Sequence, residues 1–216
     1  FAQKKPNAIE ECEDWSFDPN VIYGTSGALR HYYNTKVQSE DLVLGWIGLE
    51  TVVVNPDYIL GAYDVKPTSG QMLLSLCKGR LPVYPGGGKC FLGARDCAYA
   101  HLAAMNEGRS GQRYLLGHHN LTYKELLESA AKVLGTSAPR WKLPMVGTSV
   151  LGTVGRRLAS VDPHRFAGLN PYVLRSMQEN RYRTGAKMIG ELNVQPAPIE
   201  EAIEETIRWF KDNGYY

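Results

Sequence analysis

The chain has 216 residues, of which 44% are hydrophobic and 21% are charged, and its formal net charge is only +2. This composition is ordinary for a globular protein that can bury one sizeable core. The basic residues are scattered and do not form the patch that nucleic-acid-binding proteins carry. No apolar run is long enough to cross a bilayer, so neither a nucleic-acid partner nor a membrane span is expected.

The cysteines argue for a reduced, intracellular and soluble protein, whose compartment the sequence leaves open. They form neither a C-x-x-C pair nor a zinc spacing. Two disulfides are possible, but a chain of this length does not need them. His118 and His119 have no further ligands nearby, so no metal site is expected. Cys97, in a helical pattern, is interpreted as a core residue rather than a nucleophile. The polar N-terminus is unlike a signal peptide, and the missing initiator Met suggests a start within a longer protein.

In chain order, residues 1–26 are expected to be irregular and acidic. A first helix is expected over about 29–47, with Gly48 as its stop. The stretch "TVVVNP" then predicts a short strand buried on both faces, because Pro56 excludes a longer helix. A second helix is expected over 68–79, and "LPVYPGGGK" is interpreted as a turn-rich connection.

Capping residues organise the second half of the chain. Asp96 is expected to cap a helix that ends at Gly108. The stretch "QRYLLG" predicts a strand. Thr122 and Glu125 have the spacing of a capping box, and Gly135 is expected to end that helix.

The remaining signals are weak until the C-terminus. "RWKLP" predicts a short strand, and residues 145–180 show helical patterns interrupted by prolines. The last helix is the clearest, because four large apolar residues recur on one face: Ile199, Ile203, Ile207 and Phe210. Helices that alternate with short apolar strands indicate a parallel α/β fold.

The first expected helix carries Tyr32 and Lys36, four residues apart. That spacing places both side chains on one helix face. A Lys ammonium there favours the phenolate, which makes Tyr a usable general acid and base near neutral pH, and it can also bind sugar hydroxyls. Chance predicts about one such match in a chain with 13 Tyr. The spacing alone therefore leaves open an active-site pair or a solvated helix face.

Longer stretches around this pair carry a family resemblance. "YYNTKVQSE", followed after one helix length by "VVVNPDYILGAYDVKPT", resembles the extended short-chain dehydrogenase/reductase family of NAD-dependent epimerases and dehydratases. "ARDCAYAHLAAMNEGRSGQRYLLGHHNLTYKELLESAAKVLG" and "GAKMIGELNVQPAPIEEAIEETIRWFKDNGYY" are similar to later parts of that family. The similarity points to dihydroflavonol reductases and hydroxysteroid dehydrogenases, since Asn55 stands where nucleotide-sugar epimerases usually have Arg. Ala62 and Tyr63 replace the usual Pro-Gly, so the substrate-side loop departs from the family pattern.

The resemblance implies an α/β fold: the C-terminal part of a doubly wound parallel, Rossmann-like sheet with a small, mostly helical substrate lobe from about 62–92 and 140–185. It implies an NAD(P)-dependent oxidoreductase or epimerase that acts on a small hydroxyl or carbonyl substrate by hydride transfer. Tyr32 would be the acid/base, and Lys36 would favour its phenolate and bind the ribose. The residues implied in binding NAD or NADP are Tyr32, Lys36, Pro56, Asp57, Tyr58 and Ile59.

The family's glycine-rich first half has no counterpart in these residues. No glycine-rich turn follows a strand near the N-terminus, so residues 1–216 are expected to be one incomplete Rossmann-like domain that lacks roughly a hundred residues. The chain is then a truncated product, or a partner chain supplies the other half, or the tract is lost. A homo-oligomer is also open. The alternative to an enzyme is a non-catalytic, dehydrogenase-like subunit or fragment that serves as a scaffold in an assembly.

Overall fold

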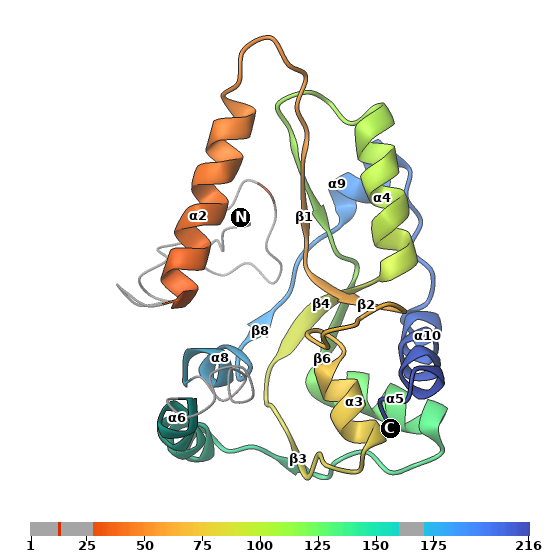
Figure 1. Cartoon of the computed structure of the whole chain (residues 1–216). Helices are drawn as coiled ribbons and strands as arrows, with labels where there is room; N and C mark the ends of the chain where they lie inside the picture. The colour runs from red at the N-terminus through yellow and green to blue at the C-terminus, as the bar shows by residue number, and fades with distance from the viewer. Residues whose placement is uncertain (1–12, 14–27, 160–170) are drawn as a thin grey trace.

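The computed structural model describes residues 13, 28–159 and 171–216, which form an α/β fold (Figure 1). Its helices are α2 (Ala28–Leu44), α3 (Gln71–Cys77), α4 (Ala94–Glu107), α5 (Tyr123–Leu134), α6 (Met145–Ala159), α8 (Pro171–Ser176), α9 (Ala186–Leu192) and α10 (Ile199–Asp212). Its strands are β1 (Val53–Pro56), β2 (Tyr58–Leu60), β3 (Val83–Tyr84), β4 (Gly88–Gly93), β5 (Arg113–Leu116), β6 (His119–Thr122), β7 (Trp141–Lys142) and β8 (Asn180–Arg181).

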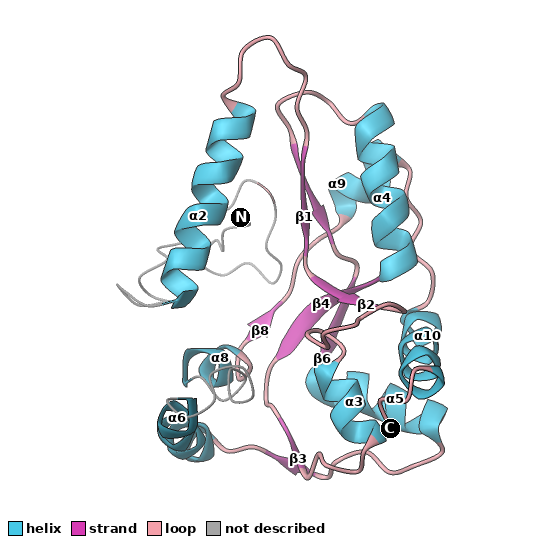
Figure 2. Ribbon diagram, viewed as in Figure 1, coloured by secondary structure: helices cyan, strands magenta, loops and turns pink. Residues whose placement is uncertain are grey.

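Most of the strand pairs are parallel, which confirms the predicted α/β class. β1 pairs with β5 in parallel. β4 is the centre of a second sheet, with β2 and β8 parallel to it and β6 antiparallel. β3 pairs in parallel with β7. Figure 2 shows β1, β2, β4 and β6 in the middle of the molecule with helices around them, and β3 at its lower edge.

Two apolar clusters hold the described part of the chain together. One packs α3, α5 and α10 against β2 and β4, and the other packs α4 and α9 against β4 and β5. Helix α10 contributes Ile199 and Ile203 to the first cluster, and both side chains are at most 4% exposed. Removing such side chains from water stabilises the fold by about 1.5–3 kcal/mol each.

Several local predictions are confirmed. Thr122 and Glu125 form the capping box of α5, and Gly135 ends that helix in the left-handed conformation with φ 63°. The strand predicted from "QRYLLG" is β5, and the strand predicted from "RWKLP" is β7. The first predicted helix is α2, although it ends at Leu44, before the expected stop at Gly48. The C-terminal helix is α10. The predicted breaks at Asp162-Pro163 and Asn170 lie outside the described residues.

The interpretation of "LPVYPGGGK" as a turn-rich connection was wrong, because the stretch contains strand β3 and the start of strand β4. Gly88–Gly93 is strand β4, and all six of its residues are buried. The glycines serve close packing there: a Cβ on Gly87 would lie 2.3 Å from the Glu179 carbonyl oxygen, and one on Gly88 would lie 2.6 Å from the Leu121 carbonyl oxygen. Glycine therefore lets β4 enter between its neighbours, which a local sequence signal does not reveal.

Two further predictions need correction. Asp96 does not cap α4, because the helix begins after Gly93; Asp96 lies in the first turn and accepts a hydrogen bond of 3.1 Å from the Ala197 backbone N–H. β1 is not buried on both faces: its residues are half-buried or exposed. Within the described ranges β1 pairs with β5 along one edge, so part of its surface stays accessible. No helix among the described residues is long and apolar enough to cross a membrane.

Candidate functional site

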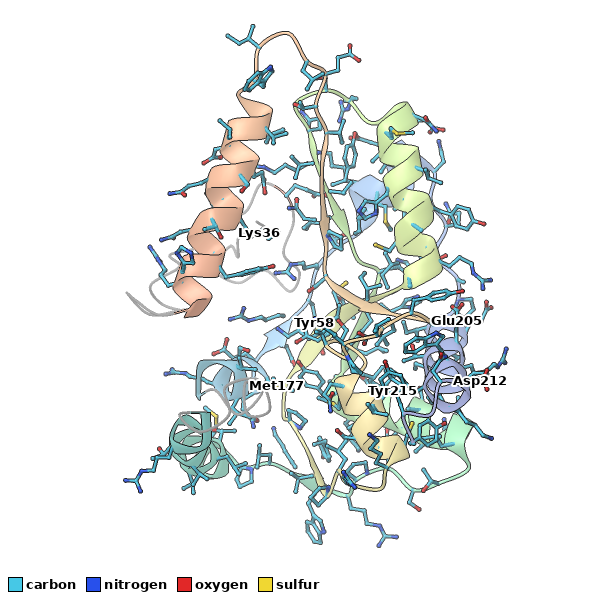
Figure 3. The ribbon with its side chains drawn as sticks, in the orientation of Figure 1. Lys36, Tyr58, Met177, Glu205, Asp212 and Tyr215 are labelled. Carbon is cyan, nitrogen blue, oxygen red and sulfur yellow. The ribbon has the colours of Figure 1, made fainter. Side chains whose placement is uncertain are left out.

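Helix α2 carries the candidate acid/base pair on an exposed face. Tyr33 and Glu40 are buried on the side that faces the sheet. Tyr32, on the neighbouring face, is 55% exposed, and Lys36 is also exposed. The Lys36 ammonium lies 5.7 Å from the centroid of the Tyr32 ring, so the two side chains share a face, as their spacing predicts. Figure 3 shows Lys36 on this helix, which stands beside β1.

Glu40 fixes α2 against the sheet. Its carboxylate pairs with the guanidinium of Arg113 on β5 and accepts a hydrogen bond of 3.3 Å from Asn55 Nδ2 on β1. The Glu40 side chain is only 7% exposed. A carboxylate this buried needs such partners, because desolvating an unpaired charge costs several kcal/mol. The helix is therefore attached next to the residue that precedes Pro56.

The carboxyl end of β1 is the second part of the candidate site. Pro56 is exposed, and Asp57 donates its backbone N–H to the Leu116 carbonyl over 3.1 Å. The Asp57 carboxylate pairs with Arg183 Nη1 at 2.5 Å, and the two side chains are 10% and 19% exposed. Ile59 packs against the α4–α9 cluster. A buried ion pair thus occupies the turn where β1 passes into β2.

Arg183 reaches this turn from a rigid position. Its backbone N–H donates to Asn120 Oδ1 at 3.0 Å, and its carbonyl accepts from Asn120 Nδ2 at 2.9 Å. The Cys90 thiol also donates to that carbonyl at 3.6 Å. Residues of β4 and β6 therefore hold the Arg183 backbone on both sides.

Tyr58, the first residue of β2, lies beside several polar side chains and also packs against the first apolar cluster. Its ring lies edge-on to Phe91 at 5.8 Å, and the Lys89 ammonium is 5.5 Å from the ring centroid. Burial raises the pKa of Tyr58, and the charge of Asp57 raises it further, against the opposing effects of Tyr123 and Arg181. Burial also raises the pKa of Tyr123. Both phenols therefore stay neutral at physiological pH. Figure 3 labels Tyr58 near the crossing of β2 and β4.

An acid/base pair is expected to point into a cleft. The described residues do not enclose Tyr32, whose side chain is 55% exposed. A pocket of about 260 Å³ lies between the start of α4 and α10. Another, of about 420 Å³, lies beside α5, α10 and Tyr216. Neither is lined by Tyr32, Lys36 or residues 56–59.

Cys97 packs in the core, as the sequence interpretation held. It is 8% exposed, and burial, followed by the charge of Asp96, raises the pKa of its thiol to about 11. The ring of His101 is 3.7 Å from the sulfur, but its Nδ1 is 2.7 Å from the Cys97 carbonyl oxygen. The thiol therefore stays protonated and is a poor nucleophile.

The sequence interpretation missed the polar residues that surround Asp57 and Tyr58. Lys89 is 7% exposed and lies inside a strand that had been interpreted as a turn. Arg181 and Arg183 alternate in "NRYR", a pattern that equally fits a solvated surface. Lys89 within the apolar stretch "GKCFLG" was the one available signal of this polar cluster, since charged residues are rarely buried without partners.

Comparisons with known proteins identify sequences that are similar to this chain. No family model matches. A Synechocystis sp. protein named as a dihydroflavonol 4-reductase is 27% identical over 187 residues, which cover 82% of this chain and 53% of that protein. Sterol demethylase protein B of Methylococcus capsulatus is 28% identical over 190 residues, which cover 85% of this chain and 57% of that protein. The present chain thus spans about half the length of these relatives.

Solved structures extend the comparison to the whole chain. A nucleoside-diphosphate-sugar epimerase of Pseudomonas aeruginosa matches 100% of this chain and 65% of its own, with a TM-score of 0.78 and 25% identity. These similarities support the expected resemblance to the extended short-chain dehydrogenase/reductase family. The dTDP-glucose 4,6-dehydratase of Bacillus anthracis, solved in complex with NAD, shares the fold at a TM-score of 0.65 and 17% identity. It matches 100% of this chain and 60% of its own, so this neighbour too has residues beyond the matched part.

Proposed function

We propose that this chain carries the acid/base and substrate-binding part of an NAD(P)-dependent oxidoreductase or epimerase that acts on a small hydroxyl or carbonyl substrate. The observation that carries the proposal is the shared face of Tyr32 and Lys36 on α2. That helix is tied by Glu40 to Asn55, at the end of β1. Ligands of parallel α/β folds bind outside the carboxyl ends of the strands.

In this mechanism Tyr32 and Lys36 have different roles. Tyr32 gives a proton to the substrate oxygen during reduction and takes it back during oxidation. Lys36 places a positive charge on the same helix face as Tyr32 and donates hydrogen bonds to ribose hydroxyls. The backbone of residues 56–59 would border the nicotinamide, and bound NAD(P) would supply the hydride chemistry. The neutral Tyr58 borders the substrate side.

The residues present fit one end of such a cofactor. The Lys36 ammonium and the turn after β1 suit a nicotinamide riboside. Among the described residues, no glycine-rich turn joins a strand to a helix in the way that pyrophosphate binding requires. A second, glycine-rich half is therefore part of the proposal. We call the protein that carries both halves the two-half form. We further propose that segments 62–92 and 140–185 form the substrate lobe of a single domain.

Tyr32→Phe in the two-half form tests the proposal. The substitution keeps the ring and removes the acidic hydroxyl, so turnover should fall by roughly 10²–10⁴-fold while cofactor affinity changes little. Tyr99→Phe is the matched control, because Tyr99 is 61% exposed on a different helix, α4. Normal turnover of Tyr32→Phe would overturn the proposed mechanism.

A scaffold role is the rival proposal, and the 55% exposure of Tyr32 on the surface of α2 favours it. A non-catalytic subunit would keep its fold and its partner contacts in the Tyr32→Phe and Lys36→Met variants. A two-half form with no measurable turnover on any hydroxyl or carbonyl substrate, and with no affinity for NAD or NADP, would support the scaffold.

A further inference from the structure

The ion pair of Asp57 and Arg183 stands at the turn that the proposed function assigns to the nicotinamide, and this inference rests on that function. The pair joins the end of β1 to a residue just after β8 at 2.5 Å. Both side chains are largely buried, so the pair is weakly screened by solvent.

The Arg183 backbone is hydrogen-bonded to residues of two strands, which distinguishes Arg183 from a flexible surface cation. Asn120 bonds both its N–H and its carbonyl, and Cys90 bonds the carbonyl as well. These bonds fix the backbone from which the Arg183 side chain extends. The guanidinium is thus directed to Asp57 by strands β4 and β6.

The charge of Asp57 reaches its neighbours in the turn. After burial, that charge is the second cause of the raised pKa of Tyr58. A nicotinamide ring is cationic in the oxidised cofactor and neutral in the reduced one. An uncompensated carboxylate at this turn would therefore attract the oxidised form selectively.

We propose that Arg183 is a positioning residue for the cofactor turn: it orients the Asp57 carboxylate and neutralises it, so that the turn binds oxidised and reduced nicotinamide without a charge bias. Neither residue touches the reacting atoms in this proposal. Arg183 acts through Asp57, and Asp57 acts through its charge and through its backbone bond to Leu116.

The direction in which each substitution shifts the ratio of affinities for oxidised and reduced cofactor tests the proposal. In the two-half form, titration calorimetry measures separate dissociation constants for NAD⁺ and NADH, and likewise for the NADP pair. Arg183→Gln leaves a bare carboxylate and should shift the affinity ratio toward the oxidised form by on the order of tenfold. Asp57→Asn removes the negative charge at this turn and should shift the ratio the opposite way. The double variant should return it to within about twofold of the original, because the charges cancel.

Controls separate charge from structure. Arg183→Lys keeps the charge and should keep the ratio, and it also serves if Arg183→Gln fails to fold. Arg175→Gln, at an exposed position on α8, should change nothing. Equal weakening of both cofactor forms in both single variants would show a merely structural pair and overturn the inference. A wild-type two-half form that binds neither cofactor form would overturn the proposed function, and the inference with it.

Discussion

Asn55 donates a hydrogen bond from Nδ2 to Glu40 Oε2 over 3.3 Å, and this bond links the end of β1 to the helix that carries the candidate acid/base pair. Glu40 also pairs with Arg113 on β5. One buried carboxylate therefore sets where Tyr32 and Lys36 stand relative to the sheet.

Glu40→Ala should loosen α2 from the sheet. The substitution leaves Arg113 without this carboxylate and should lower the free energy of unfolding by about 2–4 kcal/mol, since removing one member of a buried pair strands the other. Urea denaturation followed by circular dichroism measures the change. Asp41→Ala, at the exposed neighbouring position, is the control and should cost less than about 0.5 kcal/mol. Equal stability of the two variants would mean that α2 does not depend on Glu40.

Lys36→Met should impair both turnover and cofactor binding in the two-half form. It removes the positive charge that lies beside the Tyr32 ring, so proton transfer and turnover should slow. It also removes a donor to the ribose, so cofactor binding weakens, by roughly tenfold for a charge-assisted hydrogen bond. Steady-state kinetics across pH and calorimetry measure the two effects separately. Lys78→Met, an exposed lysine after α3, should leave both unchanged. Loss of turnover with unchanged cofactor affinity would remove the ribose contact from the proposed role.

The 216-residue chain alone should bind NADH and NADPH weakly or not at all. Nothing in its described residues offers the glycine-rich turn and helix N-terminus that hold a pyrophosphate. Titration calorimetry with each dinucleotide checks this, with the two-half form as the positive control. Micromolar binding by the 216-residue chain would show that its own residues are sufficient.

The capping box of α5 should stabilise the fold in a pH-dependent way. Hydrogen bonds from the Thr122 backbone and side chain hold the pKa of Glu125 below its usual value. A carboxyl with a lowered folded-state pKa contributes stability above its unfolded pKa, near 4.5, and that contribution is lost as pH falls through the folded pKa. Glu125→Gln should therefore flatten the loss of stability below about pH 4.5.

Thr122→Ala removes the other half of the capping box and should cost about 1 kcal/mol at neutral pH. Thermal unfolding across pH measures both substitutions. Thr136→Ala, at an exposed position after α5, is the control. An unchanged pH dependence in Glu125→Gln would exclude the carboxylate as its source.

Local signals were sufficient for most helices and for the spacing of the candidate pair. The capping box of α5 and its left-handed Gly135 follow from residues within a few positions of each other. The same holds for the apolar face of α10 and for the shared face of Tyr32 and Lys36. Helical geometry relates residues three and four apart, so the sequence order itself carries this information.

The sequence by itself determined these elements, the α/β class and the family resemblance, because each depends on neighbours in the chain or on runs of matching residues. Only the tertiary structure decided that Gly88–Gly93 is a buried strand and that Arg183 pairs with Asp57. A glycine run favours turns locally, and it becomes a strand here because β2, β6 and β8 supply its hydrogen-bond partners at distances that exclude a side chain at Gly88. The partner of Asp57 is set by packing between segments far apart in the chain, which no local pattern encodes.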